Sequence, residues 1–397
     1  MRVVRCDGSP ESVAALSEAL AAALAGGPAV LPVEGAVASG AASGGCAGPV
    51  AGAGGGRGGL PDPVGGSALV VETSGSTGEA KRVVLSAAAL RASARATHRR
   101  LGGPGRWLLA LPVHHIAGAQ VLVRGLLAGQ RPCVLDCREG FRVDRFAALA
   151  TALCDEAGGR RCYTSLVPTQ LHRVLAEGPG RGLDALRRFD AVLVGGAATS
   201  PALLAEAAGA GVAVVTSYGM SETAGGCVYD GVALEGVRVR LDPVDGRISL
   251  AGPMLATGYL GDPTRTAGSF GGDWFHTCDV GRWDGDGRLG VLGRVDDVII
   301  SGGAKVHPAA VERVLTALPG VDAACVVGLA DPEWGQLVAA AVVCADPVGL
   351  VALRRAVRAE LGAASVPRLI RTLTELPLHG IGKPDRTEVI RLLAATR

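Results

Sequence analysis

Aromatic residues and net charge are both scarce in this sequence. Phe, Trp and Tyr make up 3% of the chain, and its 39 Lys and Arg residues nearly balance its 37 Asp and Glu residues. There is no basic tract and no stripe of interleaved basic and aromatic residues, which are the usual footprint of a nucleic-acid-binding chain. The composition therefore argues against nucleic acid as the main partner.

Long apolar runs are also missing. Stretches such as "VRGLLAG" and "DAACVVGLA" are interrupted by Gly or charge well before they reach the span of a bilayer, so no membrane helix is predicted. The N-terminal "MRVVRCDGSPES" has no apolar segment or cleavage site of a secretory signal. The ten cysteines then fit a reducing cytosol, where they act as small apolar side chains, and we expect a cytoplasmic protein.

Zinc-binding cysteine patterns are absent too. Cys133 and Cys137 are the closest pair, and no second Cys or His pair follows at zinc-finger distance. No metal–thiolate site is predicted.

Glycine is abundant, with 60 residues, but most of the chain keeps a regular apolar periodicity. The exception is residues 35–66, "GAVASGAASGGCAGPVAGAGGGRGGLPDPVGG", which have almost nothing to bury and predict a mobile linker or irregular insert. A chain of 397 residues is also long for one core, so two or more domains are expected.

Short strand-like runs alternate with helical patterns through most of the chain. "RWLLALPV", "AVLVGGA" and "AVVTSYG" are typical of buried strands, whereas "SAAALRASARATHRRL" and "PALLAEAAGAG" have helical spacing. This alternation predicts an α/β architecture with a largely parallel sheet, in which ligands gather at loops beyond the carboxyl ends of strands.

The pattern of apolar and turn-forming residues changes from Leu241 onward. Short runs separated by turn signals, such as "GRISLAG", indicate an antiparallel β segment. After Gly303, helical and strand patterns suffice for a small α+β unit. We therefore predict a large N-terminal α/β domain of parallel and mixed sheets, residues 1–295, and a small α+β C-terminal domain, residues 296–397, with the boundary near Asp296.

The stretch "VVETSGSTGEAKRVVLS" places glycines, hydroxyl residues and a lysine between apolar runs. It is not a Walker A loop, because Ala80 and Arg82 occupy the positions of the second glycine and the hydroxyl residue, and a strand-like run follows. A hairpin loop is predicted instead, with Ser74, Ser76 and Thr77 at an anion site near Lys81. An ordinary Gly/Ser turn remains the alternative at this point.

Other loops carry single charged residues in suggestive places. In "TSYGMSETAGG", Glu222 follows a buried strand and is either a magnesium ligand beside a nucleotide phosphate or a simple loop acid. In "WFHTCDVG", Asp279 is either an acceptor for ribose hydroxyls or a turn residue. Lys383, in "LPLHGIGKPDR", would by itself be read as solvated surface charge.

Taken in order, "TSGSTGEAK", "LPVHHIAG", "VGGAA", "YGMSET", "WFHTCDVG", "GRVDDVIISGGAKVHP" and "GIGKPDR" resemble the consecutive motifs of the adenylate-forming superfamily of acyl-CoA synthetases, adenylation domains and luciferases. Each motif is weakly specific, but the ordered series over residues 73–386 is very specific. The resemblance makes the first loop the ATP-phosphate loop.

The resemblance also implies roles for individual residues. The ATP triphosphate would be held by Ser74, Gly75, Ser76, Thr77, Gly78 and Lys81. The adenosine would be bound by Gly195, Gly196, Ala197, Tyr218, Gly219, Asp279 and Arg294, with Tyr218 stacking on adenine and Asp279 and Arg294 on the ribose. Glu222 would ligate Mg²⁺, and Asp296 would be the hinge. The catalytic residues would be Lys383, between the substrate carboxylate and the α-phosphate, Ser221 at that phosphate and His115 beside the acyl pocket.

The implied reaction suits these residue types. A carboxylate that attacks an α-phosphate brings two anions together, so positioning and cation placement carry most of the catalysis, and no general base is needed. ATP, Mg²⁺ and coenzyme A are the implied cofactor and co-substrates. The small domain would swing about Asp296 to admit coenzyme A, whose thiol displaces AMP.

Three positions depart from the family pattern. Cys278 and Arg82 stand where glycine is common, and Ser221 stands where threonine is frequent. The chain is also shorter than is usual in the family, with the loss before Thr73. These departures affect local geometry more than chemistry.

In its length, its motif order and the segments "LALPVHHIAGAQVLVRGLLAG" and "SLVPTQLHRVL", the chain looks most like the o-succinylbenzoate–CoA ligases of menaquinone biosynthesis, in the short form of high-GC actinobacteria. That substrate carries a second carboxylate, which an arginine would recognise. Arg173, in "VPTQLHRVL", is the candidate, although a solvated arginine on a helix that buries Leu171 and Val174 explains it equally well. His115, Ser165 and Thr169 are further candidates for the acyl pocket.

Three alternatives stay open. Another aryl- or acyl-CoA ligase would share every motif and differ in its pocket residues. A stand-alone adenylation enzyme would load a carrier protein instead of coenzyme A. A non-catalytic nucleotide-binding module comes last, because it should have lost Lys383 or Glu222. A homodimer is also left open by the resemblance, since dimers are common among relatives.

Overall fold

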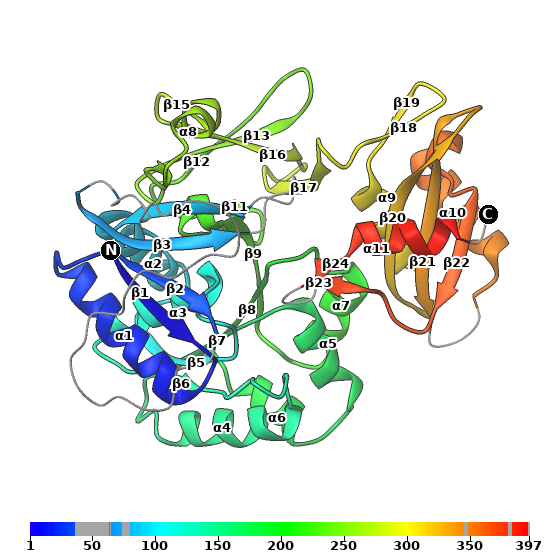
Figure 1. Cartoon of the computed structure of the whole chain (residues 1–397). Coiled ribbons are helices and arrows are strands. Elements are labelled where there is room, and N and C mark those ends of the chain that lie inside the picture. The colour runs from blue at the N-terminus through cyan, green and yellow to red at the C-terminus, as the bar shows by residue number, and fades with distance from the viewer. Residues whose placement is uncertain (36–62, 64, 74–79, 345–347, 380–382, 396–397) are drawn as a thin grey trace.

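The computed structural model describes residues 1–35, 63, 65–73, 80–344, 348–379 and 383–395. Most of the glycine-rich segment 35–66 lies outside these residues, so the prediction of a linker there stays a prediction. The described residues form five sheets with helices between and around them, which confirms the predicted fold class (Figure 1).

The first sheet contains the predicted hairpin. Its strand order is β1 (Arg2–Cys6), β2 (Val30–Glu34), β3 (Ser67–Thr73), β4 (Lys81–Ser86) and β14 (Gly258–Tyr259). The first three strands are parallel, and β4 returns antiparallel to β3 with Thr73 opposite Lys81. The two-residue β14 then pairs with the outer edge of β4.

The second sheet is the parallel sheet that the alternating pattern predicts. Its order is β11 (Val232–Ala233), β10 (Gly225–Tyr229), β9 (Val214–Met220), β8 (Ala191–Gly195), β7 (Arg161–Leu166), β5 (Gly105–Leu109) and β6 (Cys133–Val134). The strands from β9 to β6 are parallel, and β10 and β11 are antiparallel additions. The carboxyl ends of β7, β8 and β9 therefore meet at one edge.

Three helices fill the space between these two sheets: α1 (Pro10–Leu24), α2 (Ala87–Arg100) and α3 (Ile116–Leu127). Ser9 and Ser86 begin the first two, each accepting a backbone N–H bond through its hydroxyl oxygen. Fully buried side chains such as Leu20 and Leu122 pack there into one apolar cluster that includes residues of both sheets.

Four helices cover the other face of the second sheet: α4 (Val143–Asp155), α5 (Pro168–Ala176), α6 (Arg181–Arg187) and α7 (Pro201–Gly209). They bury a second apolar cluster, with Phe146 and Leu171 fully enclosed. The second sheet is thus covered on both faces, as parallel sheets are.

A third, antiparallel sheet follows. It consists of β12 (Arg238–Leu241), β13 (Arg247–Ala251), β15 (Phe270–Gly271), β16 (Trp274–Trp283) and β17 (Leu289–Arg294), beside the short helix α8 (Pro263–Ser269). It confirms the antiparallel segment expected from Leu241 and begins three residues earlier, at Arg238.

The fourth sheet is built from residues after Asp296. It contains β18 (Ile299–Ser301), β19 (Ala304–Val306), β20 (Val321–Asp331), β21 (Gly335–Cys344) and β22 (Leu369–Leu373). Helices α9 (Pro308–Thr316) and α10 (Leu350–Leu361) cover one face, and α11 (Arg386–Ala394) covers the other. The short turn η2 (Ala363–Ser365) and the hairpin of β23 (Leu378–His379) and β24 (Lys383–Pro384) complete this part, at the right of Figure 1.

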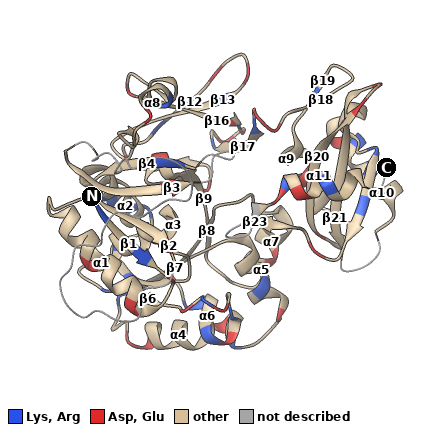
Figure 2. Cartoon of the chain, viewed as in Figure 1, with Lys and Arg blue, Asp and Glu red and all other residues tan. Residues whose placement is uncertain are grey.

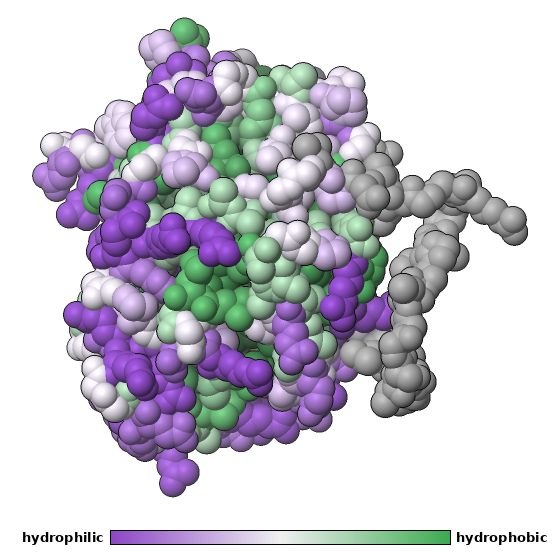
Figure 3. Space-filling view, turned by 90° about the vertical axis from the view of Figure 1, so that its left-hand side faces the viewer, coloured by the Kyte–Doolittle hydropathy of each residue, from purple (hydrophilic) through white to green (hydrophobic). Residues whose placement is uncertain are grey.

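The surface carries both charged and apolar residues. Basic and acidic residues are both scattered over the ribbon in Figure 2, and Figure 3 shows exposed apolar areas set among hydrophilic ones on one face. Within the described residues, no helix has the length and apolar character needed to cross a membrane.

The apolar clusters of the described residues separate along the chain. Four clusters use residues up to Leu289, and two use residues from Ile299 onward. The residues before and after this division therefore form two separate cores. We expect a substitution in one core to destabilise that part of the chain alone, which hydrogen exchange can test.

We expect Leu315→Ala to reduce hydrogen-exchange protection in β20 and β21 while leaving β3 and β5 unchanged. Leu315 is fully buried in the later core, and truncation of such a leucine costs about 2–5 kcal/mol. Leu20→Ala, in the earlier core, is the matched control and should give the reverse pattern. Equal loss of protection in both parts would show a single cooperative core.

Candidate active site

Lys81, Glu222 and Tyr259 form one cluster, although they come from three separate parts of the chain. Lys81 Nζ donates to Glu222 Oε1 at 2.5 Å, and the Tyr259 hydroxyl donates to the same oxygen at 2.9 Å. Lys81 Nζ also lies 5.3 Å from the centre of the Tyr259 ring. Glu222 is 2% exposed, so its charge is compensated by these two contacts rather than by bulk water.

Glu222 stands in η1 (Ser221–Thr223), directly beyond the end of β9. Within the described residues no group of three or more His, Cys, Asp or Glu side chains gathers as a metal site. A single carboxylate nevertheless fits Mg²⁺ in a nucleotide site, because this ion keeps several waters and takes further oxygens from phosphates. The cluster is therefore compatible with Mg²⁺ bound together with ATP.

Tyr218, Asp279 and Arg294 form a second cluster. The Tyr218 hydroxyl donates to Asp279 Oδ2 at 2.7 Å, and Arg294 Nη1 donates to Asp279 Oδ1 at 3.3 Å. Asp279 and Arg294 are direct partners across β16 and β17. Arg294 Nη2 reaches Asp296 Oδ2 at 3.1 Å, which brings the predicted hinge residue to the edge of this cluster.

The Tyr218 hydroxyl stays protonated in this setting. Burial and the neighbouring Asp279 charge raise the pKa of Tyr218 far above its ordinary value. The hydroxyl is therefore a hydrogen-bond donor, which orients the ring and one oxygen of the Asp279 carboxylate.

Glycines allow the backbone to approach closely around Tyr218. A Cβ atom on Gly219 would lie 2.2 Å from the Gly225 carbonyl oxygen, and one on Gly195 would lie 2.8 Å from the Ser217 carbonyl oxygen. Any larger residue would push β8, β9 and β10 apart. Gly195 is the last residue of β8, and Gly196 and Ala197 follow it; their part in binding adenosine stays a prediction.

The acyl-pocket candidates occupy the same end of the second sheet. Ser165 is buried near the end of β7, and its hydroxyl has no hydrogen-bond partner among the described residues. Thr169 is half-buried in the first turn of α5. His115 precedes α3, with its ring centre 4.3 Å from that of His114.

Arg173 does not join these side chains. It is exposed on α5 and lines a surface depression of about 500 Å³ with Phe141, Asp144 and His172. A role in reading a second carboxylate therefore stays a prediction.

The phosphate loop and the catalytic lysine are only partly covered by the described residues. Ser74, Gly75, Ser76, Thr77 and Gly78 lie outside them, although the hairpin that carries the loop is confirmed. The backbone of Lys383 lies in β24, opposite His379, and its side chain is outside the described part.

The departures from the family pattern are accommodated locally. Arg82 pairs with Glu72 across the β3–β4 hairpin at 2.9 Å. Burial raises the pKa of the Cys278 thiol, and its carbonyl oxygen accepts from Val295 N–H at 2.7 Å. Ser221 is buried at the start of η1, one residue before Glu222.

Sequence analysis missed Tyr259. Its segment, "ATGYLGD", carries no charged or catalytic signature. Only the pairing of β14 with β4 brings its hydroxyl to Glu222.

Similarity to known proteins identifies the family to which the chain belongs. The model of the AMP-binding enzyme family matches residues 65–260, and that of the AMP-binding enzyme C-terminal domain matches residues 310–383. The chain belongs to this family of adenylate-forming enzymes.

Two similar sequences and two solved structures narrow the comparison. The probable 2-succinylbenzoate–CoA ligase of Mycobacterium tuberculosis is 48% identical over 336 residues, covering 82% of this chain and 85% of the relative. The 2-succinylbenzoate–CoA ligase of Listeria monocytogenes is 32% identical over 81% of this chain and 69% of the relative.

The o-succinylbenzoate CoA synthetase of Bacillus subtilis, in complex with the acyl-adenylate intermediate OSB-AMP, matches with a TM-score of 0.70 and 28% identity over 81% of this chain and 68% of its own. The amide bond synthetase McbA of Marinactinospora thermotolerans matches with a TM-score of 0.73 and 32% identity, over 82% of this chain and 69% of its own. Both similarities extend over most of the chain.

We expect Asp279→Asn to weaken the binding of AMP and of ATP by the same factor, roughly tenfold to a hundredfold, because charge-assisted hydrogen bonds are lost. Titration calorimetry with each nucleotide measures this. Asp284→Asn, in the exposed turn of the same β16–β17 hairpin, is the matched control and should bind normally. An unchanged AMP affinity in Asp279→Asn would remove Asp279 from the nucleotide site.

Proposed function

We propose that the chain is an AMP-forming acid–thiol ligase that converts 2-succinylbenzoate, ATP and coenzyme A into 2-succinylbenzoyl-CoA, AMP and pyrophosphate. The observation that carries the choice of acid is the 48% identity to the Mycobacterium tuberculosis relative, which extends over 82% of this chain. The two side-chain clusters, one at Tyr218 in β9 and the other at Glu222 directly after β9, support the nucleotide half of the reaction.

The first half-reaction joins the substrate carboxylate to the α-phosphate of ATP. The carboxylate is already ionised, so no residue has to remove a proton. Lys81 would hold the phosphates, and Glu222, which Lys81 contacts, would hold Mg²⁺, whose charge would offset that of the phosphate oxygens. Tyr218, Asp279 and Arg294 would fix the adenosine.

Other residues keep their predicted roles as part of this proposal. Ser221 would contact the α-phosphate, and His115 would border the acyl pocket. Lys383 would bridge the carboxylate and the α-phosphate. The first half-reaction ends when the bond from the α-phosphorus to the bridging oxygen breaks and pyrophosphate leaves. In the second half-reaction the thiol of coenzyme A attacks the acyl carbon, a C–S bond forms as the acyl C–O bond breaks, AMP leaves, and the thiol proton passes to solvent.

Movement of the C-terminal part between the two half-reactions is also proposed. The division after residue 295 is supported by the separate apolar clusters and by the turn of residues 295–297 that joins β17 to β18. Asp296 lies in that turn and is exposed. A few residues of this kind suffice for a hinge.

Ser165 and Thr169 would border the acyl group. Ser165 has a buried hydroxyl without a partner among the described residues, which suits a substrate oxygen. Arg173 is the candidate for the second carboxylate.

A cytosolic location and a homodimer are the remaining parts of the proposal. The nine cysteines within the described residues are all free thiols, as expected in a reducing compartment. The homodimer rests on resemblance to the family.

The test of function is ATP-dependent formation of AMP and acyl-CoA by purified protein. We expect strong preference for 2-succinylbenzoate over benzoate, a cinnamate and a medium-chain fatty acid. Preference for another of these acids would contradict the assigned substrate and retain the ligase reaction. Formation of acyl-adenylate without any transfer to coenzyme A would favour a carrier-loading enzyme.

Lys383→Ala should lower acyl-adenylate formation by roughly 100-fold to 1,000-fold, because a cation at the transferring phosphate is lost. Attack of coenzyme A on supplied acyl-adenylate should stay close to the wild-type rate. Pyrophosphate release and thioester formation measure the two steps separately. Arg391→Ala, an exposed change in the neighbouring helix α11, is the control. Equal loss in both steps would contradict the role assigned to Lys383.

A further inference from the structure

The carbonyl oxygen of Ala224 accepts hydrogen bonds from two different helices. Gln120 Nε2 of α3 donates to it at 2.8 Å, and Ser93 Oγ of α2 donates at 2.9 Å. Gln120 and Ala224 are fully buried, and Ser93 is 3% exposed. Ala224 stands two residues after Glu222, so both helices contact the turn that carries this carboxylate.

The backbone of that turn has an unusual conformation. Ala224 has φ 50° and ψ 38°, in the left-handed region that disfavours residues with a Cβ atom. Its N–H donates back to the Ser221 carbonyl oxygen at 3.1 Å, and Gly225 follows with φ 95°. Such conformations persist where surrounding contacts hold them, and the two bonds to the Ala224 carbonyl are contacts of this kind.

The role of Gln120 is not explained by apolar packing alone. Its Oε1 is buried without a hydrogen-bond partner among the described residues, which destabilises the folded state relative to an apolar side chain of similar size. Its side chain also lies against the turn, since a Cβ atom on Gly225 would come within 3.3 Å of Gln120 Cγ. The useful contact of Gln120 is therefore its bond to the Ala224 carbonyl.

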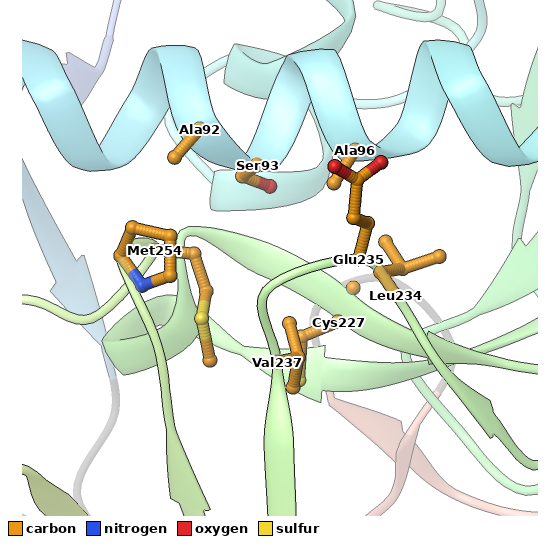
Figure 4. A pocket seen from close by; sticks show the side chains of 10 residues that line it. Ala92, Ser93, Ala96, Cys227, Leu234, Glu235, Val237 and Met254 are labelled. Carbon is orange, nitrogen blue, oxygen red and sulfur yellow. The ribbon is translucent and has the colours of Figure 1, made fainter.

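Neither side chain can touch the substrates. Both are buried on helices that pack between the first two sheets, and Figure 4 shows Ser93 on α2 at a small cavity that Met254 and Val237 also line. The cavity has about 10 Å³ of space, which is enough for one water molecule at most. Any influence on the reaction must pass through the backbone of the turn.

We propose that Gln120 and Ser93 are positioning residues that hold the Ser221–Thr223 turn through the Ala224 carbonyl and so place the Glu222 carboxylate for Mg²⁺ and the ATP phosphates. This inference rests on the proposed function, because that proposal gives Glu222 its magnesium role. Loss of either bond should loosen the turn and weaken the part of ATP binding that depends on Mg²⁺.

The experiment measures ATP affinity with and without Mg²⁺, using a fluorescent ATP analogue and unlabelled ATP as competitor, in the absence of any acid substrate. Gln120→Met keeps the length of the side chain and removes the donor. We expect the gain in ATP affinity on adding Mg²⁺ to fall about tenfold, and the affinity in EDTA to stay unchanged. Ser93→Ala removes the other bond and should act in the same direction.

A second substitution tests the pathway through the backbone. Ala224→Gly lets the left-handed conformation form without a Cβ penalty. Added to Gln120→Met, it should restore part of the Mg²⁺-dependent gain. No restoration would show that the loss does not act through the conformation of residue 224 and would overturn the proposal.

Thr97→Val is the matched control. Thr97 lies one turn beyond Ser93 on α2, is equally buried, and is hydrogen-bonded to the Tyr229 hydroxyl at 3.0 Å rather than to the turn. It should leave the Mg²⁺-dependent gain unchanged. An equal loss in Thr97→Val, or a loss of ATP affinity in EDTA as large as that in Mg²⁺, would indicate general damage to the core and overturn the proposal.

The result of this binding test can be distinguished from the result of the test of the proposed function. Nucleotide binding is measured without the acid, so failure to convert 2-succinylbenzoate would reject the substrate and leave this test intact. A wild-type protein whose ATP affinity does not respond to Mg²⁺ would overturn both the magnesium role of Glu222 and the positioning role of Gln120 and Ser93.

Discussion

The ion pair between Lys81 and Glu222 joins residues 141 positions apart in the chain and links the first and second sheets at the site. Lys81 begins a strand of the first sheet, and Glu222 follows a strand of the second. Since Glu222 is almost fully buried, loss of its partner would leave an uncompensated charge, at a cost of about 3–5 kcal/mol. The two side chains that the proposal assigns to the nucleotide are therefore also a contact between the two sheets.

Local patterns in the sequence predicted the elements of this site well. The β3–β4 hairpin, the strand before "MSET" and the antiparallel segment after it all follow from periodicity and turn residues. The ordered motifs then identified Asp279 and Arg294, which the structure shows to be cross-strand partners. Tyr259, Gln120 and Ser93 could not be found in this way, because each reaches the site through tertiary packing. Arg173 was suggested by the second carboxylate that the resemblance implies, and its exposed position on α5 leaves that role a prediction.

The two acidic residues at the proposed hinge contact different parts of the chain, one before the hinge and one after it. Asp296 receives a hydrogen bond from Arg294, which also contacts Asp279 of the nucleotide cluster. Asp297, the next residue, pairs at 3.6 Å with Arg386, which contacts Glu312 of α9 at 2.9 Å. Successive residues are thus anchored to different cores. Rotation between them would preserve both sets of contacts, and this arrangement suits a hinge made of very few residues.

The contacts of Asp279 affect how tightly a nucleotide can be held. Its carboxylate already accepts from Tyr218 and Arg294 before any ligand arrives. A ribose hydroxyl bound there would share this carboxylate with both donors, so its bond would add less to affinity than a bond to an unpaired carboxylate. An enzyme that must discard AMP after every cycle gains from such a site, because a modest hold on the spent nucleotide shortens its residence time and frees the enzyme for the next ATP.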